Sequence, residues 1–107
     1  MPENSSEIKA ERVTETLVVY QQKGVFSFGT DAMLLADYVS EQPSTANAGK
    51  MCDLCSGTGV LSLVLCDRFE KLSADAVELN PTAAELSSKS ASESGLDHRF
   101  TAHTADI

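Results

Sequence analysis

The chain has 107 residues, 42% of them hydrophobic, and its 16 acidic side chains outnumber 8 basic ones, which gives a formal charge of -8. This is the composition of a folded protein, and the length has room for one domain. The negative charge excludes an autonomous nucleic-acid binder, because such a protein needs a clustered Lys/Arg face to displace counterions. The sequence also shows no signal peptide and no apolar segment of the ~20 residues that cross a bilayer, so we expect a cytoplasmic protein without a membrane partner.

The N-terminal part of the chain predicts a flexible tail followed by a β-hairpin. Residues 1–13 are polar and mark the tail, so the folded domain is expected to span 14–107. Segment 14–20 is rich in β-branched and aromatic residues, and a similar segment, 25–28, follows after a Gln-Lys-Gly turn. We expect these two segments to pair as neighbouring strands.

A helix and a linker follow the predicted hairpin. Thr30 has the side chain of an N-cap, and Asp31 stands in the first turn, where a carboxylate interacts favourably with the helix dipole. The helix is expected over 31–39. Turn-forming residues over 40–49 predict a surface linker.

Beyond the linker, apolar segments of strand length alternate with longer segments of helical character. Asn80 and Pro81 suit the N-cap and first position of the second of these helices, which Gly95 is expected to end. Alternation at this spacing is typical of right-handed βαβ crossovers, so the predicted fold class is α/β with a parallel sheet. The predicted strands are 50–54, 75–78 and 100–107, and the predicted helices are 60–70 and 82–94.

The segment D-L-C-S-G-T-G, residues 53–59, joins the first of these strands to the first helix. Gly57 and Gly59 can adopt backbone angles closed to other residues, and they allow a ligand to approach the main chain. The helix that begins near Val60 directs its free N–H groups and the positive end of its dipole into the same space. The segment therefore predicts a loop for a nucleotide-like ligand; the alternative is a tight strand-to-helix turn without a ligand.

Glu78 lies nineteen residues beyond Gly59, at the predicted end of the next strand. A carboxylate there can accept hydrogen bonds from both hydroxyls of a ribose. Without the glycine loop, the same residue would be interpreted as a solvated glutamate at a strand end. The loop and Glu78 together favour a cofactor that contains a nucleoside.

Neighbouring residues distinguish two cofactor classes. A dinucleotide fingerprint would need its third glycine where Ser62 stands. Asp53 is a carboxylate at the end of an apolar strand, where an ammonium group on the ligand would compensate for burial and a pyrophosphate would be repelled. S-adenosyl-L-methionine carries an amino group and a sulfonium, so it is favoured over NAD. The alternative for Asp53 is a turn-capping role.

Three segments together resemble a known family. They are F-S-F-G-T-D-A-M-L-L-A-D-Y at 26–38, D-L-C-S-G-T-G-V-L-S-L at 53–63 and A-V-E-L-N-P at 76–81. The set resembles the N-terminal half of class I S-adenosylmethionine-dependent methyltransferases, and within them the small-domain group that includes bacterial tRNA1(Val) adenine-N6 methyltransferases. The resemblance covers residues 14–107 and implies a partial S-adenosyl-L-methionine-binding domain of Rossmann-like fold, truncated after about three parallel strands.

The resemblance implies roles for individual positions. Asp53, Cys55, Ser56, Gly57 and Gly59 correspond to the first methyltransferase motif, whose loop wraps the methionine end of the cofactor. The cysteine stands where glycine is common, and its small side chain is compatible with the loop.

The remaining implied cofactor contacts come from three other parts of the chain. Glu78, with Leu79 beside it, corresponds to the acidic residue on the ribose, and Asp106 to the carboxylate that meets the adenine amino group. Thr30 and Asp31 correspond to an upstream loop that closes on the cofactor.

The resemblance also implies what this sequence lacks. Relatives that methylate an exocyclic amine carry Asn-Pro-Pro followed by Tyr or Phe after the fourth strand, which holds the target nitrogen. The only Asn-Pro here, at 80–81, follows Glu78 and begins a helix, so it is not that motif. No catalytic residue is therefore assigned, and the sequence is interpreted as a truncated enzyme whose tRNA or other nucleic-acid substrate would be bound through missing regions.

Such a truncation would leave the strand over 50–54 with an unpaired edge and an apolar face. We therefore expect the chain to form a homo-oligomer, to take a strand from a complementing chain or to be poorly stable. Three function hypotheses stay open: a methyltransferase part whose parent modifies an amine on nucleic acid or protein, a non-catalytic cofactor-binding or interaction fragment, and a fragment of an NAD-dependent oxidoreductase.

A metal site is not expected. Cys52 and Cys55 with His98 and His103 have the residue types of a zinc site, but forty-two residues lie between the two pairs, against ~12 to 15 in finger-type sites.

Overall fold

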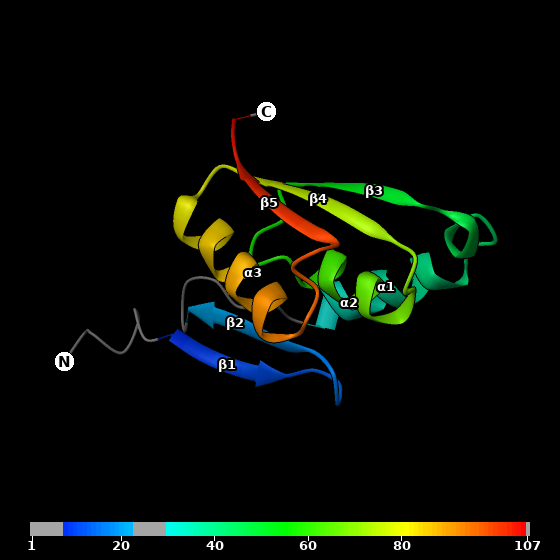
Figure 1. Cartoon of the computed structure of the whole chain (residues 1–107), viewed down its shortest axis with the longest axis horizontal. Helices are drawn as coiled ribbons and strands as arrows, with labels where there is room; N and C mark the ends of the chain where they lie inside the picture. The colour runs from blue at the N-terminus through cyan, green and yellow to red at the C-terminus, as the bar shows by residue number, and fades with distance from the viewer. Residues whose placement is uncertain (1–7, 23–29, 107) are drawn as a thin grey trace.

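The computed structural model describes residues 8–22 and 30–106, and its larger sheet has three parallel strands in the order β3-β4-β5 (Figure 1). Helix α2 connects β3 to β4, and helix α3 connects β4 to β5. The sequence prediction of an α/β fold with a parallel sheet is confirmed. The bounds of these elements are β3 Lys50–Leu54, α2 Val60–Arg68, β4 Ser73–Glu78, α3 Pro81–Glu93 and β5 Phe100–Thr104.

Helices α1 (Thr30–Glu41), α2 and α3 lie on one side of this sheet (Figure 1). Helix α1 begins at the predicted N-cap itself and is followed by a 3-10 helix, η2, Thr45–Asn47. On the covered face, Ala74, Ala76 and Phe100 are buried at 0 to 4% exposure. The core therefore lies between the sheet and the helices.

The opposite face of the sheet, which we call the open face, carries exposed and largely polar side chains. Cys52 pairs in register with Asp75, and Leu54 pairs with Val77, which in turn pairs with His103. Cys52, Leu54, Asp75 and His103 are all exposed. The exposed face expected for β3 is thus present among the described residues, but it is mixed in character and not uniformly apolar.

The described part of the N-terminal hairpin pairs the predicted strand with a segment that precedes it in the chain. Strand β2, Val18–Gln22, pairs antiparallel with β1, Ile8–Arg12, which precedes it and lies within the segment assigned to the tail. The predicted partner, 25–28, lies outside the described residues. Three of the five residues of β1, Lys9, Glu11 and Arg12, are charged, so the segment lacks the β-branched and aromatic pattern that predicts a strand; edge strands tolerate such charges.

Ser90 of α3 and the C-cap residue Ser94 hold the hairpin against the rest of the chain. The main-chain N–H groups of Val18 and Tyr20 donate to the Oγ atoms of Ser94 and Ser90, at 2.9 and 2.7 Å. The ammonium of Lys89 lies 4.6 Å from the centre of the Tyr20 ring. The hairpin therefore packs on the side of α3 that faces away from the sheet (Figure 1).

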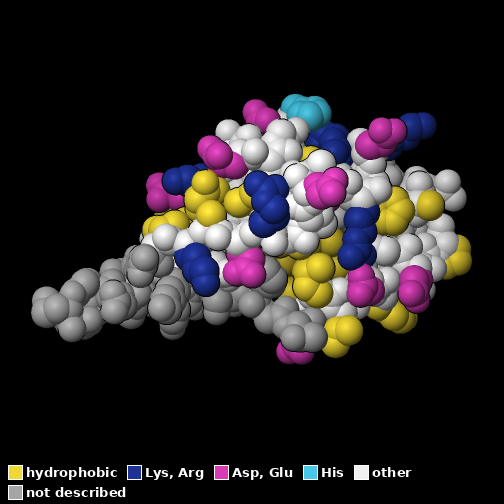
Figure 2. Space-filling model, turned by 90° about the horizontal axis from the view of Figure 1, so that it is seen from below, with side chains coloured by type: hydrophobic (Ala, Val, Ile, Leu, Met, Phe, Trp, Pro, Cys, Tyr) yellow, Lys and Arg dark blue, Asp and Glu magenta, His cyan; other side chains and the backbone are white. Residues whose placement is uncertain are grey.

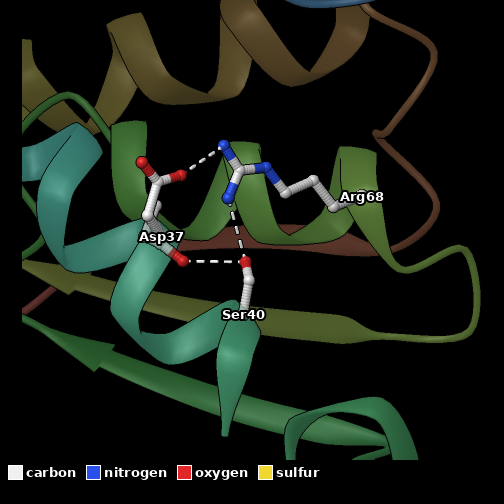
Figure 3. Close-up of polar contacts among 4 residues, drawn as sticks. Asp37, Ser40 and Arg68 are labelled. Atoms are coloured by element: carbon white, nitrogen blue, oxygen red, sulfur yellow. Dashed lines mark hydrogen bonds and ion pairs between the residues drawn. The ribbon is translucent and has the colours of Figure 1, made fainter.

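Helices α1 and α2 are joined by a surface cluster of polar contacts (Figure 3). Arg68 at the end of α2 forms a 2.8 Å ion pair with Asp37 and donates to Ser40 Oγ at 3.0 Å. The Ser40 hydroxyl in turn donates to the Ala36 carbonyl at 2.7 Å. Both ionic side chains are partly exposed, so the ion pair itself adds little to stability.

On the face that Figure 2 shows, Lys and Arg side chains are separated from one another by acidic and hydrophobic ones. In the part of the chain that the structure describes, no helix is long and apolar enough to cross a membrane.

Candidate cofactor site

The loop at residues 55–59 leaves the carboxyl end of β3 and leads directly into α2. Cys55, Gly57 and Gly59 adopt left-handed backbone angles, with φ of 59, 60 and 82°. The N–H of Ser56 donates to the Val77 carbonyl at 3.0 Å, and the N–H of Gly59 donates to the Ser56 carbonyl at 2.9 Å. The loop is therefore folded back on itself and tied to β4.

The two glycines of the loop have different surroundings. A Cβ added to Gly59 would lie 2.8 Å from Ser87 Cβ and 3.2 Å from Phe100 Cζ, so the absence of a side chain there lets the loop pack against α3 and β5. A Cβ added to Gly57 would meet nothing within 4 Å. Only Gly57 leaves open space of the kind that a ligand would use, whereas Gly59 serves packing.

Glu78 lies directly beside this loop. Its Oε1 accepts a hydrogen bond from the N–H of Gly57 at 2.7 Å, and its Oε2 accepts from the N–H of Asn80 at 3.0 Å. The Asn80 side chain caps α3, as predicted, by accepting from Thr82 N and Ala83 N at 2.9 and 3.2 Å. Main-chain donors on both sides therefore fix the carboxylate at the junction of β4, α3 and the loop.

A pocket of about 290 Å³ opens at the carboxyl ends of the strands and is lined by Cys55, Glu78, Leu79, Ala105 and Asp106. Four of these five residues were predicted from the sequence to belong to the site. Ala105 was missed because a lone alanine carries no chemical signal. Its N–H donates to the Glu78 carbonyl at 3.1 Å, which brings the chain after β5 to this end of the sheet.

Asp53 lies at the end of β3 on the helix-covered face. Its Oδ2 accepts a hydrogen bond from Ser62 Oγ at 2.8 Å. Burial raises the pKa of Asp53, an effect that the hydrogen bonds from Ser62 oppose and the neighbouring Glu78 charge reinforces. The sequence indicates Ser62 only as the residue in place of a third glycine, and it gives no signal for this contact with Asp53.

The other predicted site residues are less closely tied to the pocket. Thr30 and Asp31 begin α1, which packs against α2, and their role at the cofactor stays a prediction. Ser56 Oγ is buried and has no hydrogen-bond partner among the described residues. Within 8–22 and 30–106, no group of three or more His, Cys, Asp and Glu side chains is arranged to hold a metal ion.

The pocket residues fit a nucleoside. The Glu78 carboxylate can accept from hydroxyl groups, the Asp106 carboxylate can accept from an amino group, and Leu79, 64% exposed, offers an apolar surface for a flat base. The volume is near the lower end of the ~300–1,000 Å³ typical of small-molecule sites. A glycine loop between strand and helix, with an acidic residue at the end of the next parallel strand, defines the chain as a Rossmann-like protein.

The family "Methyltransferase small domain" matches residues 16–107, and the chain belongs to it. It is similar to a tRNA1(Val) (adenine(37)-N6)-methyltransferase of a Flavobacteriaceae bacterium, with 34% identity over 88 residues, 82% of this chain and 36% of the relative. It is also similar to the ribosomal protein uL3 glutamine methyltransferase of Bradyrhizobium diazoefficiens, with 34% identity over 58 residues, 54% of this chain and 18% of the relative.

Comparison with a solved structure also indicates a methyltransferase fold. The S-adenosylmethionine-dependent methyltransferase SibL, in its apo form, superposes with a TM-score of 0.62 and 25% identity over 70% of this chain and 22% of its own. The resemblance to class I methyltransferases is thereby confirmed. The chain spans about a third of the tRNA methyltransferase it matches.

Proposed function

We propose that this chain is the S-adenosyl-L-methionine-binding part of a methyltransferase. The observation that carries the proposal is the 2.7 Å hydrogen bond between the Gly57 N–H and Glu78 Oε1, which joins the glycine loop to the acidic residue that would bind a ribose. The matched family and a neighbour named as S-adenosylmethionine-dependent support this cofactor. When bound, it would supply a methyl group on a sulfonium, which is a good leaving group.

The residues of this chain would bind and orient the cofactor. Glu78 would accept from the ribose hydroxyls, Asp106 from the adenine amino group, and Leu79 would pack against the base. Asp53 would face the amino group of the methionine part. Asp53 and Glu78 place negative charge on both sides of the loop, which disfavours the pyrophosphate of NAD.

The acceptor in this proposal is a planar nitrogen, with N6 of an adenine in tRNA as the first choice. One relative is named for adenine N6 and another for glutamine, and both groups present an NH2 on a planar carbon. In the transfer, the nitrogen forms a bond to the methyl carbon, the carbon–sulfur bond breaks, and a proton leaves the nitrogen. Because the chain has a formal charge of -8, the contacts to tRNA are assigned to basic surface outside it.

Calorimetric titration with S-adenosylhomocysteine and, separately, NADH tests the cofactor. We expect saturable binding of the first and none of the second. Glu78→Ala removes the acceptor for two ribose hydroxyls and is expected to weaken binding at least tenfold, a loss of ~1.4 kcal/mol or more. Glu85→Ala, which removes an exposed carboxylate from α3, is the matched control and should bind as the parent does. Equal affinity of the two variants, or preferential NADH binding, would overturn the proposal.

We also propose that the chain self-associates through β3. This strand pairs only with β4 among the described residues, so its other edge presents free N–H and C=O groups. Sedimentation velocity over a concentration series should show dimers or larger species. A monodisperse monomer that is also thermally stable would contradict this expectation.

A further inference from the structure

Ser62 is completely buried on α2, and its hydroxyl makes an unusual connection for a helical serine. A serine inside a helix ordinarily donates to a carbonyl of the preceding turn. The two buried serines of α3 do so: Ser87 Oγ donates to the Ala84 carbonyl at 2.7 Å, and Ser90 Oγ to the Leu86 carbonyl at 2.9 Å. Ser62 instead donates out of its helix to Asp53 Oδ2 on β3, at 2.8 Å.

This bond crosses the base of the glycine loop. Asp53 is two residues before Cys55, where the loop begins, and Ser62 is three residues after Gly59, where it ends. Hydrogen bonding from Ser62 lowers the pKa of the Asp53 carboxyl, against the larger effect of burial, which raises it. The Ser62 hydroxyl thus supplies a donor to a carboxylate that burial would otherwise drive toward its neutral form.

We propose that Ser62 is a positioning residue of the cofactor site, whose hydroxyl orients the Asp53 carboxylate to receive the amino group of the methionine part. This inference rests on the proposed function and deepens it. It assigns the recognition of the amino acid end of the cofactor to the Ser62–Asp53 pair, and that of the nucleoside end to Glu78, Leu79 and Asp106. The serine therefore has a chemical role at a position where a dinucleotide fingerprint has glycine for close packing.

Two ligands that differ only at the amino acid end distinguish a role of Ser62 in recognising that end from a general effect of Ser62 on the fold. S-adenosylhomocysteine carries the amino group, whereas 5′-methylthioadenosine has the same nucleoside and thioether without it. Ser62→Ala keeps the helix and removes only the hydroxyl. We expect it to weaken binding of S-adenosylhomocysteine on the order of tenfold, the effect of losing a hydrogen bond to a charged group, and to leave 5′-methylthioadenosine within about twofold.

The pH dependence of binding provides a second measurement. With one donor fewer, the Asp53 carboxyl ionises at higher pH, so the affinity for S-adenosylhomocysteine should rise with pH at a higher midpoint in Ser62→Ala than in the parent. Ser90→Ala is the control, because it removes a buried helical serine hydroxyl that holds the hairpin at Tyr20. It should lower the unfolding free energy without changing the ratio of the two affinities.

The outcomes distinguish the inference from the proposed function. If the parent chain does not bind S-adenosylhomocysteine, the proposed function fails. If the parent binds but Ser62→Ala loses both ligands equally, or neither, with an unchanged pH midpoint, the serine is only structural and the inference is overturned.

Discussion

The two faces of the β3-β4-β5 sheet are built from the same strands but follow different rules. On the helix-covered face, Ala74, Ala76 and Phe100 are buried at 0 to 4% exposure and hold the core together. On the open face, Asp75 and His103 are about half exposed and pair with each other in contact with water. Adjacent residues of one strand therefore differ in burial and packing, and so in the unfolding free energy that is lost when they are replaced.

The difference between the two faces shows which strand positions must be apolar for the fold and which positions tolerate substitution. Strands buried on both faces are near-continuous apolar segments, whereas β4, S-A-D-A-V-E, alternates. Any element that covered the open face would have to supply hydrogen-bond partners to Asp75 and His103, because burial would remove their contacts with water. The covered face also supports Asp53 and the glycine loop, so the core and the candidate site depend on each other.

The largest expected contrast lies between two neighbours on β5. Phe100→Ala removes a buried ring and leaves a cavity between the sheet and α3, which should cost about 3–5 kcal/mol of unfolding free energy. Thr101→Ala, one residue further on the open face, should stay within about 0.5 kcal/mol of the parent. Urea denaturation followed by circular dichroism measures both. Similar losses at the two positions would show that the open face is buried in solution.

A second contrast lies within the glycine loop. Gly59→Ala forces a Cβ to within 2.8 Å of Ser87 Cβ at a φ of 82°, and overpacking plus backbone strain should cost about 2–4 kcal/mol. Gly57→Ala meets open space, so only the backbone cost of about 1–2 kcal/mol applies. The same denaturation experiment ranks the two variants. Equal losses would mean that contact with the covered face is not what distinguishes these glycines.

Much of this arrangement could be predicted from the sequence, because the signals are local. Asn80 and Pro81 mark the start of α3, and the spacing from Gly59 to Glu78 places the carboxylate beside the loop. What could not be predicted depends on contacts between distant segments. The hydrogen bonds from β2 N–H groups to Ser90 and Ser94 span 70 and 76 residues. Strand β1 has only one β-branched residue, Ile8, of the kind that marks strands in a sequence. The contact of Ser62 with Asp53 likewise could not be predicted, because it depends on how α2 is oriented relative to β3.

A third prediction concerns pH and the covered face alone. Because burial raises the pKa of Asp53 above the ordinary value of 3.8, the folded chain binds a proton there that the unfolded chain has released. The stability that this proton provides is present at low pH and is lost as pH rises through the raised pKa. Asp53→Asn removes the titration and keeps an acceptor for Ser62, so its unfolding free energy relative to the parent should increase as pH rises from about 4 to 7. A constant difference across that range would contradict the assigned burial.

The smallest effect is expected on the open face. His103 Nε2 lies 2.9 Å from Asp75 Oδ1, and the two side chains are 48 and 53% exposed. Exposed pairs of this kind contribute little after screening by water, so a double-mutant cycle of His103→Ala and Asp75→Ala should give a coupling below about 0.5 kcal/mol that decreases with added salt. Asp37→Ala with Arg68→Ala is a suitable reference, because that pair also lies on the surface and has a similar separation of 2.8 Å. A coupling above about 1.5 kcal/mol that resists salt would mean that water is excluded from the pair, and the self-association proposed at the neighbouring β3 edge would then extend over this face.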